Sequence, residues 1–300
     1  MKKIAVFFNE PGSTDYPFNK PEYLSSYQIL DSEISKLGAE FFIVRSNDTY
    51  EGNGVFTKSW RFESGKIIEA GKLVVDSLYD KGGFVSDNTI NVLNREEVNE
   101  ICTNKWKTYN VFKEFCPKTI VANTKNEFIL ALKEIPGDRK VIKPVDGEEG
   151  RGVYIGENQY LLEKNKTFPV LVQEFLDTSE GIPNIYVGIH DLRVVYINGE
   201  IIYSFYRTPP PGKLLANVAQ GGQLTVVDKA DLPKEVFFIS DKVRESFKND
   251  YCFSVDLGFV KGVPKIIELN SRPAVFHPDR GEEFLTFIKK IAHVLTHPTT

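Results

Sequence analysis

Residues 254–273 read SVDLGFVKGVPKIIELNSRP and carry the strongest local signal in the chain. The pattern predicts two apolar strands joined by a loop at residues 261–263. Glu268 and Asn270 are two residues apart on the second strand, so their side chains face the same side. A loop of three residues pairs Asp256 with Glu268 on that face, whereas a loop one residue shorter or longer turns Asp256 to the other face.

These three polar residues have the chemistry of a metal site. Carboxylate and amide oxygens are the hard ligands that Mg²⁺ prefers in proteins. Both strands are otherwise apolar, and polar oxygens converging on one face would repel one another without a cation. We therefore interpret Asp256, Glu268 and Asn270 as metal ligands. The alternative is that they are solvent-facing positions of a half-exposed hairpin.

A second hairpin supplies two cationic side chains. Residues 194–206 surround Asn198-Gly199, the strongest short-range turn signal that a sequence can contain. A regular two-residue turn would point Arg193 and Arg207 to opposite faces of the sheet unless a bulge or a twist intervenes. Each arginine either contributes to a phosphate site or is a solvated surface residue.

A third segment combines a lysine on a strand with a glycine-rich loop. Residues 141–153 read VIKPVDGEEGRGV. Lys143 would supply a fixed cation, and the glycines at 147, 150 and 152 let the backbone approach a phosphate closely. The alternative is an ordinary hairpin loop. The segment is not a P-loop, since GxxxxGK[ST] occurs nowhere, and its glycine spacing does not fit a dinucleotide fingerprint.

Composition limits the class of protein. The chain has 300 residues, 41% of them hydrophobic and 26% charged, as in an ordinary globular protein. A net charge of −4 argues against a nucleic-acid or anionic-membrane surface as the main partner. No segment approaches the roughly 18 apolar residues of a membrane span. The three cysteines form no CxxC pair, which favours buried thiols in a reducing compartment. We expect a soluble, cytoplasmic protein.

The first hundred residues alternate between strand and helix patterns, which is typical of a parallel α/β sheet. Between residues 47 and 71 the pattern is less regular. The helix is expected around residues 27–37, and the strands are expected at 4–8, 41–44, 73–78 and 89–93.

Taken in order, the motifs resemble the ATP-grasp superfamily, most closely its ribosomal-protein glutamate ligase and glutathione synthetase-like branch. They are VLNREEVNEICTNKWKTYNVFKEF at 92–115, VIKP at 141–144, QEFL at 173–176, DLR at 191–193, Arg207, Asn217, Gly221-Gly222 and Asp256…Glu268-x-Asn270. The resemblance implies an α/β and α+β chain. A Rossmann-like, pre-ATP-grasp domain would occupy residues 1–100. An ATP-grasp fold of two α+β subdomains would follow, at 101–175 and 176–300.

The resemblance also implies a role for each candidate residue. Those that would bind ATP are Lys105 and Lys143 at the α/β-phosphates, Gly147, Gly150 and Gly152 over them, Glu174 and Phe175 at adenine, and Asp191 near the ribose. Those that would hold Mg²⁺, with Mn²⁺ as a substitute, are Asp256, Glu268 and Asn270. Arg207 and Asn217 would stabilise the transferred phosphoryl group, and Arg193 would sit toward the acceptor.

Two positions depart from related patterns. Ser254 stands where D-alanine–D-alanine ligases carry an arginine, which argues against that branch. After Asn270 the chain reads Ser-Arg-Pro-Ala-Val rather than a run of small residues ending in Pro-Gly. Arg272 is therefore a further catalytic-site candidate that would bind a substrate carboxylate or phosphate. The alternative is an ion pair with Glu282 or Glu283.

The function implied is a carboxylate–amine ligase that works through an acyl-phosphate and releases ADP and phosphate. Its partners would be a small-molecule or peptide carboxylate and an amine acceptor, with no nucleic acid and no membrane, and a homodimer or homotetramer fits the family. Two alternatives stay open: a small-molecule kinase on the same fold, and a non-catalytic ATP-binding regulatory protein.

Overall fold

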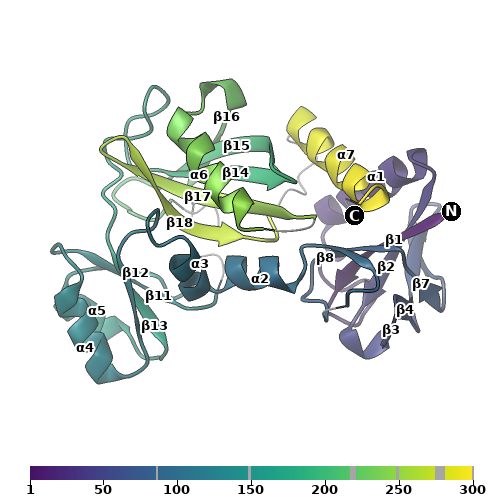
Figure 1. Cartoon of the computed structure of the whole chain (residues 1–300), viewed down its shortest axis with the longest axis horizontal. Coiled ribbons are helices and arrows are strands. Elements are labelled where there is room, and N and C mark those ends of the chain that lie inside the picture. Colours follow the sequence, from purple (N-terminus) through teal and green to yellow (C-terminus); the bar gives the residue numbers. More distant parts are fainter. Residues whose placement is uncertain (86, 148–149, 217–220, 248–249, 274–280, 299–300) are drawn as a thin grey trace.

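The computed structural model places three sheets in a row, with the N-terminal sheet at one end and a small four-stranded sheet at the other (Figure 1). The structure describes residues 1–85, 87–147, 150–216, 221–247, 250–273 and 281–298. No described helix is long and apolar enough to cross a membrane. The sheets and the helices between them confirm the expected mixed α/β architecture.

The N-terminal unit is built on a six-stranded sheet in the order β6-β5-β2-β1-β8-β9. Its strands are β1 (Lys2–Phe8), β2 (Ala39–Arg45), β5 (Trp60–Glu63), β6 (Lys66–Glu69), β8 (Ser77–Asp80) and β9 (Asn91–Leu93). Strands β2, β1, β8 and β9 are parallel, as expected, because the crossover helix α1 (Pro21–Lys36) joins β1 to β2. The antiparallel pair β5–β6 extends the edge.

The two faces of this sheet are covered differently. Helices α1 and α7 (Glu282–Thr296) pack on one face, around Ile4, Val6 and Leu30. On the other face, Phe7 of β1 shares a core with Phe56, which belongs to a second, small sheet. That sheet consists of β3 (Tyr50–Gly52), β4 (Val55–Phe56) and β7 (Leu73–Val74). The segment expected to be irregular, 47–71, therefore contains a one-turn helix, η1 (Asn47–Thr49), and four strands. A Rossmann-like domain with helices on both faces is not confirmed.

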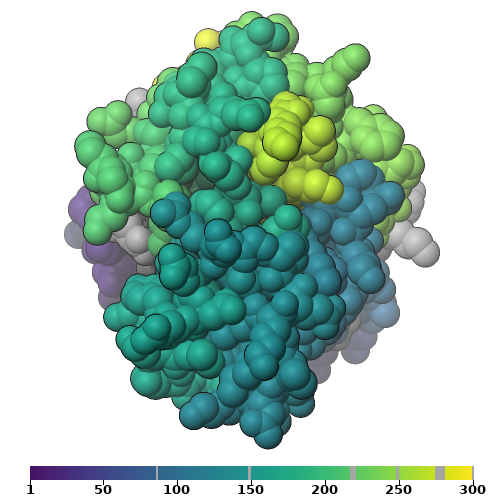
Figure 2. All heavy atoms as spheres, turned by 90° about the vertical axis from the view of Figure 1, so that its left-hand side faces the viewer, coloured from purple at the N-terminus to yellow at the C-terminus, as the bar shows by residue number. Residues whose placement is uncertain are grey.

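The small unit at the other end is an antiparallel sheet covered by two helices. Its strands, in spatial order, are β10 (Thr119–Ala122), β13 (Val170–Glu174), β11 (Lys140–Pro144) and β12 (Tyr154–Gly156). Its helices are α4 (Lys125–Glu134) and α5 (Asn158–Lys164). Phe128, Leu132 and Leu161 of the helices pack on Ile142 and Val172 of the sheet. Seen from its own end of the molecule, this teal unit lies in front of and below the green central unit (Figure 2).

The central unit is a five-stranded antiparallel sheet in the order β16-β15-β14-β17-β18. Its strands are β14 (Asp191–Ile197), β15 (Glu200–Thr208), β16 (Gln223–Val227), β17 (Cys252–Val260) and β18 (Val263–Asn270). A second one-turn helix, η3 (Lys229–Asp231), follows β16. One face packs against helices α2 (Glu96–Thr103), α3 (Lys105–Val111) and α6 (Lys234–Glu245). The other face carries the polar residues described below.

Helix α7 connects the central and N-terminal units. It lies against α1 and β15, and its apolar side shares one buried core with Val195, Ile197 and Phe205 of the central sheet (Figure 1). The three-part division at residues 100 and 175 stays a prediction.

Candidate active site

A β-bulge brings both arginines of the first hairpin to one face of the central sheet. The predicted turn is present: Asn198 and Gly199 both have positive φ (47° and 80°), as a type I′ turn requires. A bulge after Val195 then shifts the register by one residue, so Asp191 pairs with Arg207. The exception that the sequence allowed, a bulge, is therefore present, and Arg193 and Arg207 lie on one face.

A second bulge sets the register of the other hairpin. The turn consists of two residues, Lys261-Gly262, instead of the three-residue loop that we expected. On its own, the shorter turn would send Asp256 to the opposite face. A bulge beside Asp256 adds one residue and restores the pairing with Glu268. The predicted juxtaposition is confirmed, but the predicted loop that led to it is wrong.

The two bulges assemble a compact cluster of charges. Arg193 forms a fork with Asp256, with its Nε and Nη2 donating to the two carboxylate oxygens at 2.5 Å each. Arg207 Nη2 donates to Asp256 Oδ2 at 2.6 Å and also to Asp191. Glu268 lies 3.7 Å from Arg193. Asp256 is buried, whereas about a third of the Glu268 side chain (35%) is exposed.

Burial and neighbouring charges perturb the acids of this cluster in opposite directions. Burial alone would raise the pKa of Asp256, but the guanidiniums of Arg193 and Arg207 outweigh it and hold the pKa at about 2. Burial raises the pKa of Asp191 to about 7, although Arg207 opposes the shift. Asp256 is therefore ionised at neutral pH, and its charge is already shared between two cations.

One lysine of the small unit reaches the cluster, and a second lysine, at the start of α3, reaches the glycine-rich loop. Lys143, on β11, is buried, and its Nζ donates to the carbonyl of Ile267 at 3.1 Å, next to Glu268. Burial lowers its pKa to about 8, although Glu268 raises it. Lys105 begins α3 and donates through Nζ to Gly147 O at 2.6 Å. The structure thus brings Lys105 to the glycine-rich loop and Lys143 to the central sheet.

The glycine-rich loop has the backbone conformation that made glycine a candidate there. Gly147, Gly150 and Gly152 all have positive φ (144°, 70° and 72°). A Cβ on Gly152 would also meet Pro144 Cγ at 3.0 Å. Most residues with a side chain disfavour these conformations, so no side chain covers the backbone at these three positions.

The nucleoside candidates are placed less directly. Glu174 ends β13, and its N–H donates to Lys118 O at 2.9 Å, so a contact with adenine would rest on its carbonyl. Phe175 follows it, partly buried. Asp191 lies within the charge cluster through its bond to Arg207. The roles of all three residues stay predictions.

The oxygen donors on the central sheet suit a hard cation. Asp256 and Glu268 pair directly across two strands, and Asn270 follows on the same face, opposite Ser254. Asp256 accepts three hydrogen bonds from arginines, whereas the partly exposed Glu268 carboxylate has, in the described part of the chain, one ion pair with Arg193 at 3.7 Å. Among the described residues, no group of three or more His, Cys, Asp or Glu side chains is placed to hold a metal ion together. Two carboxylates and one amide remain a donor set of the type Mg²⁺ prefers.

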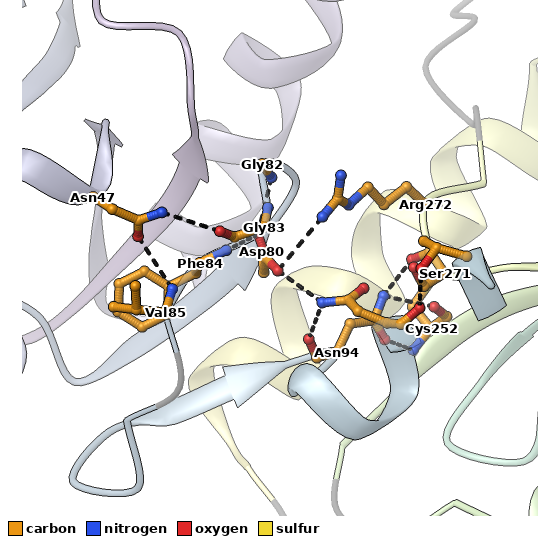
Figure 3. A network of polar contacts seen from close by, with 12 residues as sticks. Asn47, Asp80, Gly82, Gly83, Phe84, Val85, Asn94, Cys252, Ser271 and Arg272 are labelled. Atoms are coloured by element: carbon orange, nitrogen blue, oxygen red, sulfur yellow. Dashed lines mark hydrogen bonds and ion pairs between the residues drawn. The ribbon is translucent and has the colours of Figure 1, made fainter. Parts of the chain in front are cut away.

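The last two candidates are Arg272 and Asn217. The Arg272 guanidinium reaches the N-terminal unit, where Nη2 lies 3.8 Å from Asp80 Oδ2 (Figure 3). It does not pair with Glu282 or Glu283, so that alternative is wrong. Asn217 lies outside the described residues.

Sequence reasoning missed Asp80 and passed over Asn94. Asn94 is fully buried with a positive φ of 67°, and its side chain bonds both Cys252 and the carbonyl of Ser271 (Figure 3). Its signal was present in the motif at 92–115, which begins with an asparagine turn. Asp80 carried no sequence signal, because its partner is nearly two hundred residues away.

Residues 102–275, more than half of the chain, match the ATP-grasp domain family. The chain belongs to this family. Among curated relatives, it is 27% identical over 147 residues to a probable alpha-L-glutamate ligase of Shewanella pealeana, covering 47% of this chain and 30% of that protein. It is 26% identical to the glutathione synthetase of Prochlorococcus marinus subsp. pastoris, covering 85% and 87%. The chain spans about half the length or less of several curated relatives that it matches.

The whole ATP-grasp chain also has structural counterparts. It superposes on a RiPP-associated ATP-grasp ligase of Chryseobacterium gregarium, solved with ADP and a leader and core peptide, with a TM-score of 0.63 and 15% identity. The match covers 98% of this chain and 96% of that one. This similarity establishes the fold, including the N-terminal and C-terminal units.

Proposed function

We propose that this ATP-grasp protein is an ATP-dependent ligase that joins a carboxylate to an amine through an acyl-phosphate and releases ADP and phosphate. The observation that carries the proposal is the charge cluster on the central sheet. There Asp256 lies opposite Glu268, with Arg193 and Arg207 on the same face. This cluster, with Lys143 beside it, matches the charges needed to hold and transfer a phosphoryl group.

The nucleotide would lie between the small and central sheets. Lys105 and Lys143 would bind the α- and β-phosphates, and the backbone at Gly147, Gly150 and Gly152 would cover them, supported by their positive φ. Glu174 and Phe175 would line the adenine, with Asp191 toward the ribose. Lys143 suits this role because its charged amine is buried away from water, and a bound phosphate would supply the missing solvation.

Asp256, Glu268 and Asn270 would hold Mg²⁺, and Mn²⁺ fits the same oxygen donors. A bound cation would neutralise phosphate charge during transfer. Glu268 would bind the cation more readily than Asp256, because its carboxylate is partly exposed whereas that of Asp256 is paired with both arginines. Arg193 and Arg207 balance Asp256 when no cation is present.

The side chains would act by position and charge rather than as nucleophiles. Arg207 and Asn217 would stabilise the transferred phosphoryl group, and Arg193 would face the acceptor. Arg272 would bind a substrate carboxylate. Because attack comes from the substrate amine on the acyl-phosphate, the site needs only to orient two reactants and exclude water.

The partners would be a small-molecule or peptide carboxylate and an amine acceptor. The named relatives, a glutamate ligase and a glutathione synthetase, and the RiPP ligase solved with peptide support substrates of this type. A cytoplasmic location and a homodimer or homotetramer complete the proposal.

An acyl-phosphate trap tests the reaction class. The protein is incubated with ATP, Mg²⁺, hydroxylamine and pools of amino acids and other carboxylates, and ADP and hydroxamate are measured. Hydroxamate that forms only when an acid is present supports the ligase. Phosphorylation of an alcohol without hydroxamate would show a kinase instead, and binding of ATP with no turnover would favour a regulatory protein.

The metal site is tested by Glu268→Gln. The variant keeps the shape of the side chain but removes the charge, and we expect activity to fall by about a hundredfold or more, with an unchanged melting temperature. Glu200→Gln, an exposed glutamate of β15 paired with Lys290, is the matched control. Full activity of Glu268→Gln would refute the metal assignment.

A further inference from the structure

Arg272 places its guanidinium at the junction of the N-terminal and central units, where the described residues offer it few partners. A guanidinium has five N–H donors. The structure gives the Arg272 side chain one ion pair, at 3.8 Å, which is longer than a hydrogen bond, and its buried Nε has no partner among the described residues. Only 26% of the side chain is exposed. Buried donors of this kind are costly unless a ligand satisfies them.

Asp80 faces this guanidinium but cannot itself contact a ligand. Its Oδ1 accepts the N–H groups of Gly82, Gly83 and Phe84 at 2.9, 2.8 and 3.1 Å. Its Oδ2 accepts Asn99 Nδ2 at 2.8 Å, and its side chain is 2% exposed. Four hydrogen bonds therefore hold the carboxylate in place. It attracts Arg272 through its charge without consuming the N–H groups of the guanidinium.

The surrounding backbone keeps this arrangement open. A Cβ added to Gly83 would lie 3.5 Å from Arg272 Nη2, so the backbone of the glycine loop borders the guanidinium (Figure 3). On the other side, Asn94 bonds Ser271 O and fixes the chain from which Arg272 projects. The backbone N–H of Arg272 donates to Asn270 Oδ1 at 2.7 Å, so Arg272 lies directly beside the end of β18.

Asp80 also lies at a position where ligands commonly bind. It ends β8, and the carboxyl ends of parallel strands form the ligand-binding edge of open α/β sheets. A molecule seated on Arg272 would therefore touch the N-terminal unit on one side and the end of the metal-ligand strand on the other.

We propose that Asp80 is a positioning residue that holds the Arg272 guanidinium, with its N–H groups unspent, to bind a carboxylate of the substrate that does not take part in the reaction. The inference deepens the proposed function and rests on it for the identity of the site. A planar carboxylate matches the fork of a guanidinium better than any other small anion of a substrate. A purely structural interdomain ion pair would instead close to hydrogen-bond distance, as Arg193 does with Asp256.

The test reads Arg272 directly and does not depend on turnover. The full-length protein is labelled with phenylglyoxal, and the modified arginines are mapped by mass spectrometry. The probes are an equimolar pool of the twenty amino acids and the same pool as carboxamides, each with ADP and Mg²⁺. We expect the acids, but not the amides, to protect Arg272. Arg61, an exposed arginine paired with Glu63, is the internal reference and should label equally throughout.

The role of Asp80 is tested by Asp80→Asn. The amide retains an oxygen for the three backbone N–H groups. To face the new N–H₂ group, the Asn99 amide must flip, which satisfies its unpartnered Oδ1 but breaks the bond from its Nδ2 to Asn94 O. We expect the half-protecting concentration to rise about tenfold, since a mobile Arg272 must be ordered on binding. Asp87→Asn is the control: Asp87 caps a loop of the same unit through Thr89 and does not face Arg272.

If Asp80→Asn does not fold, Asn99→Ala replaces it. Loss of the Asn99 donor frees Asp80 Oδ2 to bond Arg272 directly, so the acids must displace it and protection should again weaken. Absence of protection in the wild type, or equal protection in the variants, would overturn the inference. Failure of the proposed function is seen separately, as absence of acid-dependent ADP release and hydroxamate in the wild type.

Discussion

Replacing Lys143 with methionine should make the protein more stable and unable to bind ATP tightly. Lys143 is a charged amine that is only 5% exposed, and its recorded hydrogen bond is with Ile267 O. Methionine has nearly the same length and no charge to bury. Burying the charge of the lysine therefore lowers the stability of the fold, and a bound phosphate group would offset this cost.

The size of the effect follows from the pKa of Lys143. Burial lowers this pKa from its ordinary value of 10.5 to about 8. Because each tenfold change in a protonation constant is worth about 1.4 kcal/mol, the buried charge costs about 3 kcal/mol at pH 7. Methionine removes this cost, but it also loses the hydrogen bond to Ile267 O, which is worth about 1 kcal/mol. We therefore expect Lys143→Met to raise the free energy of unfolding by about 2 kcal/mol at pH 7.

The pH dependence gives a second, independent reading. Below pH 8 the amine is charged in both folded and unfolded protein, so the full cost is present. Between pH 8 and 10.5 the folded protein loses the proton while the unfolded chain keeps it, so wild-type stability rises relative to the variant. Because the variant still lacks the hydrogen bond to Ile267 O, worth about 1 kcal/mol, its advantage should disappear at about pH 10, before the unfolded-state pKa of 10.5 is reached.

Urea unfolding of both proteins without nucleotide or metal, from pH 7 to 10.5, measures this difference, and calorimetry measures ATP binding. We expect ATP affinity to fall by about tenfold or more, the value of one charged hydrogen bond. Lys140→Met is the matched control, because Lys140 is a buried lysine of the same strand that bonds Gly137 O, and it should keep ATP binding. A variant that is less stable than wild type at pH 7, or whose advantage does not change with pH, would refute the reasoning.

Two further predictions concern buried groups. Asn94→Ala should lower the free energy of unfolding by about 4 kcal/mol in urea titrations, because it leaves Cys252 N–H and two carbonyls unsatisfied at a positive φ; a loss below about 1 kcal/mol would contradict this. Burial raises the thiol pKa of Cys116 and Cys252 to about 12 and that of Cys102 further, so the native protein should react with iodoacetamide at pH 8 only after unfolding. Rapid alkylation of the native protein would show that the thiols are accessible.

The turn chemistry was predictable, but the registers of the two hairpins were not. Asn198-Gly199 specifies a tight turn because both residues tolerate positive φ, and such a turn is local. A turn near Gly262 was also expected, but with Val263 included in the loop. The extra residues of the two bulges, Ile202 in β15 and Ile267 in β18, depend on pairing across the whole sheet. The first bulge places Arg193 and Arg207 on one face, and the second compensates for a turn that is one residue shorter than expected. In each case the face that a side chain occupies depends on one residue of register.

The N-terminal unit shows the same division. Its parallel strands follow from runs of buried apolar residues, such as 4–8, and were predicted. The small sheet β3-β4-β7 that covers one face arises from short strands of two or three residues, which are too short to show a period.

The sequence by itself determined the family, the order of the motifs and the chemical nature of the charged side chains, because these depend on residue identity and spacing along the chain. Tertiary structure alone decided which of these charges meet. Arg193, Arg207 and Asp256 converge through two bulges, and Lys143 reaches Ile267 from another sheet. Arg272 turns to Asp80 of the N-terminal unit instead of the nearby Glu282. The physical reason is that the strength of a charge interaction depends on distance and burial, and both are properties of the packed chain.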